Sequence, residues 1–170
     1  MKTKCFLLIV LLFSVCTLAK AQTFEVPQNY EFNTQADFRK YEPDLIKAVS
    51  WFEQTPYNEQ RLKRVDVAAF IMTWIQRCPY VTVETSEGIN ELGDKNNDLL
   101  VTYLAGYARF VLQGHMLGAQ TGARMAGMKA LFAKYEKDKL IIRDKRVEKL
   151  IKLDQEGGLQ AWLSDELNSK

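Results

Sequence analysis

The sequence predicts an all-α fold, a single-domain bundle or degenerate array of about five to seven helices. Apolar residues recur at steps of three and four along most of the chain, as they do on the buried face of a helix. Prolines and glycines divide these segments, and the short links favour antiparallel helical hairpins. The segment 98–112 is apolar on nearly every side, so we expect it to be a buried central helix.

The first 21 residues have the features of a secretory signal peptide. Lys2 and Lys4 precede an unbroken apolar run over 6–13, and small residues in 19–21 form a cleavage signature. The apolar run is shorter than the about 20 residues that a membrane span requires. We therefore expect cleavage after Ala21, a periplasmic or secreted location, and no membrane span after cleavage.

The predicted cleavage changes the charge and cysteine content. It would remove three of 23 basic residues and none of 21 acidic ones, so the formal charge would become −1 instead of +2. A nearly neutral protein is not expected to bind nucleic acid, which needs a basic face. Cys5 and Cys16 would also leave, and the bulky Val15 argues against a lipid anchor on Cys16. Cys78 would then have no intramolecular disulfide partner, and burial is its commoner role.

Residues 22–33 are predicted to form an extended N-terminal arm, and 34–170 a single helical domain. The arm shows no helical period, and its apolar residues nearly alternate, as in a strand-like lead-in: Phe24, Val26, Tyr30 and Phe32.

A short turn capped by Asn33 or Thr34 is expected to precede the first long helix. Pro43 fits the first position of a helix over 43–54, because its missing N–H is not needed there. The helix should end at Thr55, since the residue before a proline avoids the helical conformation.

The second long helix is predicted over 58–77, ending before Pro79. Its buried face is expected to carry residues at steps of three and four, namely Leu62, Val65, Ala69, Met72 and Ile75, widened by Phe70 and Trp74. Two basic clusters, 61–64 and 134–152, are interpreted as solvated helix faces.

Residues 80–93 are predicted to be a mostly helical connection, with a short helix capped by Thr85 or Ser86. Residues 80–84 have strand composition, but one short run cannot form a sheet alone. Asn96 or Asn97 is expected to cap the central helix.

Residues 94–98 resemble the opening of a calcium-binding loop. That loop then needs glycine and, at its twelfth position, glutamate, whereas this chain has Leu99 and Ala105. We interpret the segment as a polar turn. His115 is the only histidine, which argues against a zinc or haem site, so no metal or cofactor is expected.

Gly114 is expected to end the central helix as a left-handed cap residue. A helix over 117–138 should follow and pack closely against another helix backbone. Its small residues lie at steps of four: Gly118, Gly122, Ala126 and Ala130.

Two shorter helices are predicted at the C-terminal end, over 145–153 and 158–167. Asp144 can cap the first, which buries Val147, Leu150 and Ile151, and glycines 157 and 158 separate the two. The second should bury Leu159, Trp162, Leu163 and Leu167.

The chain is similar to a family of small secreted helical proteins of Bacteroidota. The residues that carry this resemblance are Glu25-Val26-Pro27, Tyr41-Glu42-Pro43-Asp44, Trp51, Trp74, Asn97-Asp98-Leu99-Leu100, Val147-Glu148-Lys149-Leu150 and the Ala19-Lys20-Ala21-Gln22 junction. The resemblance implies residence in the periplasm. The family has no assigned activity, so no functional residue is carried over from it.

No catalytic residue is assigned from the sequence. It contains no Gly-x-Ser-x-Gly motif and no phosphate-binding glycine loop, and its neighbouring carboxylates, Glu42 with Asp44 and Asp165 with Glu166, do not face each other on a helix. We therefore expect a helical interaction module that binds a protein or peptide partner in the cell envelope. The alternatives are a small envelope enzyme without familiar motifs and a small-ligand carrier with a pocket between helices.

Overall fold

The computed structural model describes residues 23–114 and 120–168. Within these ranges the chain forms seven α-helices, one 3-10 helix and no strand, which confirms the all-α prediction. The predicted signal peptide, His115 and Gly118 lie outside the described residues. In chain order the elements are α2 (Gln35–Gln54), α3 (Arg61–Arg77), α4 (Glu87–Asn90), η1 (Glu91–Gly93), α5 (Asn97–Leu112), α6 (Gln120–Lys137), α7 (Lys145–Gln155) and α8 (Leu159–Asn168).

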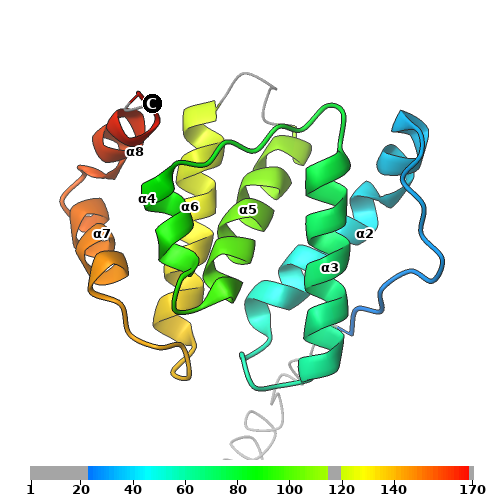
Figure 1. Ribbon diagram of the computed structural model, residues 1–170, viewed down its shortest axis with the longest axis horizontal. Helices are drawn as coiled ribbons and strands as arrows, with labels where there is room; N and C mark the ends of the chain where they lie inside the picture. The colour runs from blue at the N-terminus through cyan, green and yellow to red at the C-terminus, as the bar shows by residue number, and fades with distance from the viewer. Residues whose placement is uncertain (1–22, 115–119, 169–170) are drawn as a thin grey trace, which may run out of the picture.

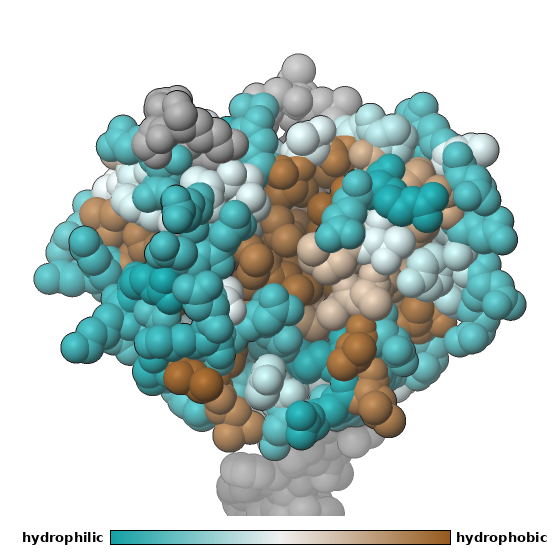
Figure 2. Space-filling view, viewed as in Figure 1, coloured by the Kyte–Doolittle hydropathy of each residue, from teal (hydrophilic) through white to brown (hydrophobic). Residues whose placement is uncertain are grey.

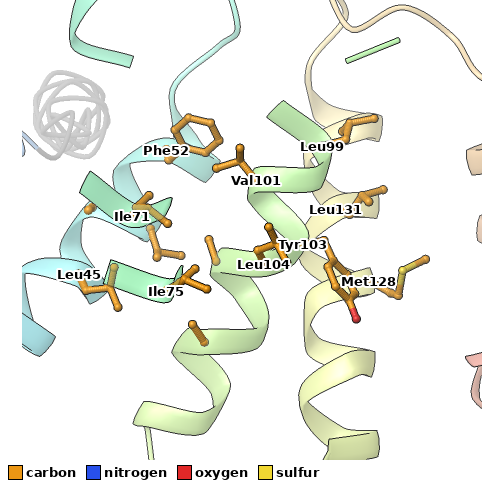
Figure 3. Packing of buried hydrophobic residues seen from close by; sticks show 14 of the residues in the cluster. Leu45, Phe52, Ile71, Ile75, Leu99, Val101, Tyr103, Leu104, Met128 and Leu131 are labelled. Atoms are coloured by element: carbon orange, nitrogen blue, oxygen red, sulfur yellow. The ribbon is translucent and has the colours of Figure 1, made fainter. Parts of the chain in front are cut away.

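Helix α5 is the centre of the bundle, as the sequence predicts. It lies between α3 and α6, and α7 and α8 lie beyond α6 (Figure 1). Every residue from 101 to 108 is buried. Figure 3 shows Leu104 directed toward Ile75 of α3, and Tyr103 toward Met128 of α6. One hydrophobic core therefore joins both sides of α5, and it reaches from Phe24 in the arm to Leu163 in α8.

The close contact between α5 and α6 depends on two glycines. A Cβ atom added to Gly127 would lie 2.7 Å from the Tyr103 carbonyl oxygen, and one added to Gly106 would lie 2.7 Å from the Cβ of Ala130. The two backbones can approach this closely because neither glycine carries a side chain. The same added Cβ on Gly106 would also lie 3.3 Å from the Ala126 carbonyl oxygen.

The prediction that the small residues of α6 meet another helix closely is right for Ala126 and Ala130 and wrong for Gly122. A Cβ atom on Gly122 would meet the ring of Phe110, 2.8 Å away, and not a helix backbone. Gly127, which lies one residue from the predicted stripe, makes the backbone contact instead. Helix α6 begins at Gln120 within the described residues.

Helix α2 is a single helix, so the prediction of a separate turn before Pro43 is wrong. Thr34 and Asp37 form a capping box: the Asp37 amide donates to Thr34 Oγ1 at 3.3 Å, and the Thr34 amide donates to Asp37 Oδ2 at 2.8 Å. A proline inside a helix costs about 3 kcal/mol. Burial of Phe38 and Leu45 on either side of it offsets that cost. The helix ends at Thr55, as predicted.

Helix α3 begins at Arg61, three residues later than predicted, and ends before Cys78 as expected. Its buried face differs from the predicted one. Leu62 and Val65 are 86% and 65% exposed, and Ala69 is exposed too. The buried residues are Arg64, Val67, Phe70, Ile71, Trp74 and Ile75.

The N-terminal arm lies along α3. Glu25 pairs with Lys63 near the start of the helix at 2.7 Å, and the Phe32 carbonyl accepts from Arg77 at its end at 2.8 Å. The arm is non-helical, as predicted, but a turn with Asn29 at a φ of 52° interrupts its extended course. Its buried rings, Phe24 and Phe32, join a cluster of aromatic side chains on α2 and α3.

The connection after α3 is only partly helical. Residues 80–85 form no regular secondary structure, so the prediction is wrong for this part and right for the short helix that follows. Ser86 caps α4 by accepting from the Ile89 amide at 3.2 Å.

The expected helix boundaries at Gly114, Asp144 and Gly157 are confirmed. Gly114 and Gly157 have φ angles of 92° and 78°, in the left-handed region that favours glycine. Asp144 caps α7 by accepting from the Arg146 amide at 2.8 Å. Among the described residues, no helix combines the length and hydrophobicity needed to cross a bilayer.

Candidate functional site

Two regions of the molecule could carry a function. One is the basal end, which we define as the α2–α3 loop (residues 55–60), the first two turns of α3, and the α6–α7 loop (residues 138–144). It forms the lower edge of the molecule in Figure 1. The other is an uncharged groove of mixed polar and apolar lining between α3 and α5, nearer the opposite end.

Arg64 is buried at the basal end because it binds the C-terminal end of α2. Its Nη2 donates to the carbonyl oxygens of Thr55 and Pro56, the latter at 2.9 Å, and its Nη1 contacts Asp98 Oδ2 at 3.0 Å. The last carbonyls of a helix have no partner within the helix and carry partial negative charge, so a cation is favourable there. This requirement turns Arg64 inward, and it leaves Leu62 and Val65 facing solvent.

Lys134 of α6 supports the same loop from the other side. Its ammonium donates to the Thr55 carbonyl at 2.5 Å and pairs with Asp138 at 3.3 Å. Asp138 in turn accepts from the Tyr57 amide at 2.6 Å. The interpretation of both basic clusters as solvated faces is therefore wrong for Arg64 and Lys134, which are 5% and 3% exposed.

Burial and hydrogen bonding shift the pKa values of this network in different directions. Burial raises the pKa of Asp98, although Arg64 opposes the shift. Burial also lowers the pKa of Lys134, and the Arg64 charge adds to this effect. For Asp138, burial alone would raise the pKa, but hydrogen bonds from the Tyr57 and Leu140 amides and from Lys134 outweigh it and the pKa is lowered.

The network has the geometry of a structural clamp. Its two cations and two carboxylates bond to one another and to the loop backbone, so they join α2, α3, α5 and α6 at one end. Two cavities of about 230 and 260 Å³ border it, one beside Lys134 and one beside Arg64. Because every one of the four charges already has an internal partner, the arrangement favours stability over acid–base catalysis.

In the turn that resembles a calcium loop, residues 94–98, the polar side chains bond to different partners and do not converge on one point. Asp94 contacts Arg146 at 3.2 Å and Asp98 contacts Arg64, while Asn96 binds the backbone of Ile142. Asn96 occupies the cap position of α5 but makes no side-chain cap bond, contrary to expectation. In the part of the chain that the structure describes, no three His, Cys, Asp or Glu side chains are grouped to hold a metal ion.

The groove has a volume of about 350 Å³ and lies beside Cys78, which is half-buried. Its lining comes from α3, α5, Asn90 and the connecting segment, and contains no charged side chain: Met72, Ile75, Gln76, Cys78, Val81, Thr82, Val83, Thr85, Asn90 and Leu104. Figure 2 shows a hydrophobic hollow in the upper centre of the molecule, where this segment passes α5. Burial raises the pKa of the Cys78 thiol, so it has little thiolate character.

The segment 81–85 forms one wall of the groove, and within the described part of the chain its backbone bonds only to side chains. Among the described residues, no backbone amide or carbonyl of 81–85 bonds to another backbone group. The segment is nevertheless held in place, because Glu84 accepts from Tyr103 Oη at 3.4 Å through its carbonyl and forms an ion pair with Arg124. A fixed non-helical segment whose remaining amides and carbonyls have no backbone partner can act as a template for pairing with another strand.

Sequence reasoning did not find the groove. The one available signal was the strand composition of residues 80–84, in a chain that otherwise reads as helical. Comparisons with protein-family models, with curated proteins and with solved structures found no match to this chain. Inferences about the function of this protein therefore depend on the chemistry of the groove and of the basal end.

Proposed function

We propose that the protein is a periplasmic or secreted interaction module, and that it binds an extended segment of a protein or peptide partner in the groove. The observation that carries this proposal is the backbone of 81–85, which makes no bond to another backbone group among the described residues and lies beside an uncharged groove. In strand addition, backbone hydrogen bonds supply affinity and side-chain pockets supply specificity.

The groove also suggests the chemistry of the bound segment. Five paired residues would span about 16 Å at 3.3 Å per residue. Alternate side chains of the partner would face the apolar side chains of Met72, Ile75 and Leu104. Burial of an unpaired charge is costly, so uncharged residues are expected at these positions.

The test is selection of short peptides from a random library on the purified protein, followed by affinity measurement on two proline variants, Thr82→Pro and Val83→Pro. Successive amides of an extended segment point to opposite sides. Only one of the two amides can therefore bond to a peptide in the groove. We expect one variant to lose about five- to tenfold in affinity, since a hydrogen bond is worth about 1–1.5 kcal/mol, and the other to bind normally.

The two proline variants act as controls for each other, because both replace residues of the same segment whose amides make no backbone bond in the free protein. Equal affinities of both variants and the wild type would contradict strand pairing. Failure to select any uncharged peptide would contradict the proposed function as a whole.

A small-ligand carrier is the second candidate, because the groove volume lies within the roughly 300–1,000 Å³ of typical ligand pockets. Native mass spectrometry of gently purified protein distinguishes the two candidates. An added mass of a few hundred daltons would favour a carrier, and a peptide-sized or protein-sized mass would favour the interaction module.

A further inference from the structure

The exposed large apolar side chains of the described residues all lie at the basal end. They are Tyr57, Leu62, Val65, Leu140 and Ile142, and they are 42–86% exposed. We call them the basal apolar set. Figure 2 shows hydrophobic patches along the lower edge of the molecule, surrounded by hydrophilic residues.

The basal apolar set comes from three segments of the chain that lie at this end: the α2–α3 loop, the start of α3 and the α6–α7 loop. The Tyr57 amide binds Asp138 at 2.6 Å, which joins the α2–α3 loop to the α6–α7 loop. Leu140 lines one cavity with Pro56, and Val65 lines another with Tyr57. Exposed apolar side chains scattered singly need no explanation, but a group of this kind marks an interaction site.

The structure holds Leu140 and Ile142 outward. Asn96 binds Ile142 at two points, accepting from its amide at 2.9 Å and donating to its carbonyl at 2.8 Å. Ile141 between them is 3% exposed and anchors the loop in the core. The side chains of this loop therefore alternate in direction: Ile141 is buried, and Leu140 and Ile142 on either side of it face solvent.

Cations accompany the apolar side chains. Lys139 precedes Leu140, Arg143 follows Ile142, and Arg61 precedes Leu62, and all three cations are exposed. Within residues 137–143 the one carboxylate is Asp138, which is buried and bonded inside the clamp. Three exposed carboxylates lie on or beside the basal end, on Glu59, Asp66 and Glu136, and they offset part of its positive charge. The α6–α7 loop thus presents aliphatic side chains between positive charges.

We propose that the basal end docks on an anionic lipid surface. Leu140 and Ile142 enter the boundary between headgroups and acyl chains, and Lys139 and Arg61 contact the lipid phosphates. Peripheral membrane proteins combine these same two terms, apolar insertion and attraction to anionic lipid. The set lies on two loops and on the first two turns of α3, at the lower edge of the molecule (Figure 1), and exposed side chains that project from such an edge can enter a deformable lipid surface.

The test is co-sedimentation of the purified protein, expressed from its full sequence, with two kinds of vesicle. One kind contains phosphatidylcholine alone, and the other an equal mixture with phosphatidylglycerol. We expect binding to the anionic vesicles only, weakened by salt. Leu140→Ser with Ile142→Ser, and separately Arg61→Glu with Lys139→Glu, should each reduce binding at least about tenfold, since one cation near the surface is worth about fivefold.

The matched control is Arg39→Glu with Lys40→Glu, the same charge change on exposed residues near the start of α2, away from the basal end. It should bind like the wild type, and circular dichroism should show that all variants fold. An equal loss in the control, equal binding to neutral vesicles, or binding unchanged in the basal variants would overturn the proposal. Binding of an acidic peptide without vesicle binding would overturn it too. The affinity of the groove for peptides is measured in a separate experiment. The proposal for the groove and the proposal for the basal end can therefore be refuted independently.

Discussion

Asp138 connects the two sides of the basal clamp. Its carboxylate pairs with Lys134 at 3.3 Å and accepts from the Tyr57 amide at 2.6 Å. Hydrogen bonds to the charged form outweigh burial and hold its pKa below the ordinary value of 3.8. The charge of Asp138 therefore stabilises the folded state above that value, and the stabilisation is lost as pH falls through the lowered pKa.

We expect Asp138→Asn to destabilise the protein at neutral pH by about 3 kcal/mol, because it leaves Lys134 buried without its carboxylate. The difference from wild type should shrink as pH falls below about 4, where the carboxylate of the unfolded chain begins to be protonated, and it should be lost once pH falls through the lowered pKa of the folded state. Thermal unfolding of both proteins between about pH 2 and pH 7 measures this. Glu136→Gln, an exposed carboxylate nearby, is the control and should remain near wild type. A constant difference at every pH would contradict the assigned role.

Helices α5 and α6 are packed with their backbones in near contact. At Gly127 the obstacle to a side chain is the Tyr103 carbonyl, which belongs to the backbone of α5 and cannot move alone. At Gly122 the obstacle is the edge of the Phe110 ring, which can rotate. The same residue type on the same helix therefore meets two different constraints.

We expect Gly127→Ala to destabilise the protein by about 1–3 kcal/mol, because overpacking forces the helices apart. Gly122→Ala should be neutral or stabilising, since alanine is favoured over glycine in a helix by about 1 kcal/mol and the Phe110 ring can adjust. Urea denaturation of the two variants measures both effects. Equal changes in the free energy of unfolding would show that the close contact at Gly127 does not limit packing.

At the scale of the whole molecule, the N-terminal arm belongs to the core. Phe32 is 2% exposed, and its ring lies 4.9 Å from that of Phe38 on α2 and 6.1 Å from that of Phe70 on α3. The arm therefore covers the joint between two helices, and it should unfold together with the bundle.

We expect Phe32→Ala to lower the free energy of unfolding by about 3–5 kcal/mol in a single transition. Tyr57→Ala, at an exposed position, should change it by less than about 0.5 kcal/mol. Circular dichroism and tryptophan fluorescence during urea unfolding should give the same midpoint for each variant. A separate early transition on replacing Phe32 would mean that the arm is an independent unit.

The sequence predicted what depends on neighbouring residues in the chain. Thr34, Ser86 and Asp144 cap helices, because a short oxygen-bearing side chain can reach the free amides of a helix start. Gly114 and Gly157 adopt positive φ angles, which local backbone sterics allow most readily for glycine. The all-α class and the burial of α5 follow from the spacing of apolar residues. That spacing can be read within each segment by itself, without knowing how the segments pack.

Only the tertiary structure decided which of several available faces is buried. Helix α3 has apolar residues on more than one side, and its orientation is set by Arg64, whose partners Thr55 and Asp98 lie nine and 34 residues away in the chain. Pro43 lies within α2 because burial of the residues around it outweighs the preference of proline for the first position of a helix. The groove and the basal apolar set are formed by segments distant in sequence, and local periodicity carries no information about how such segments meet.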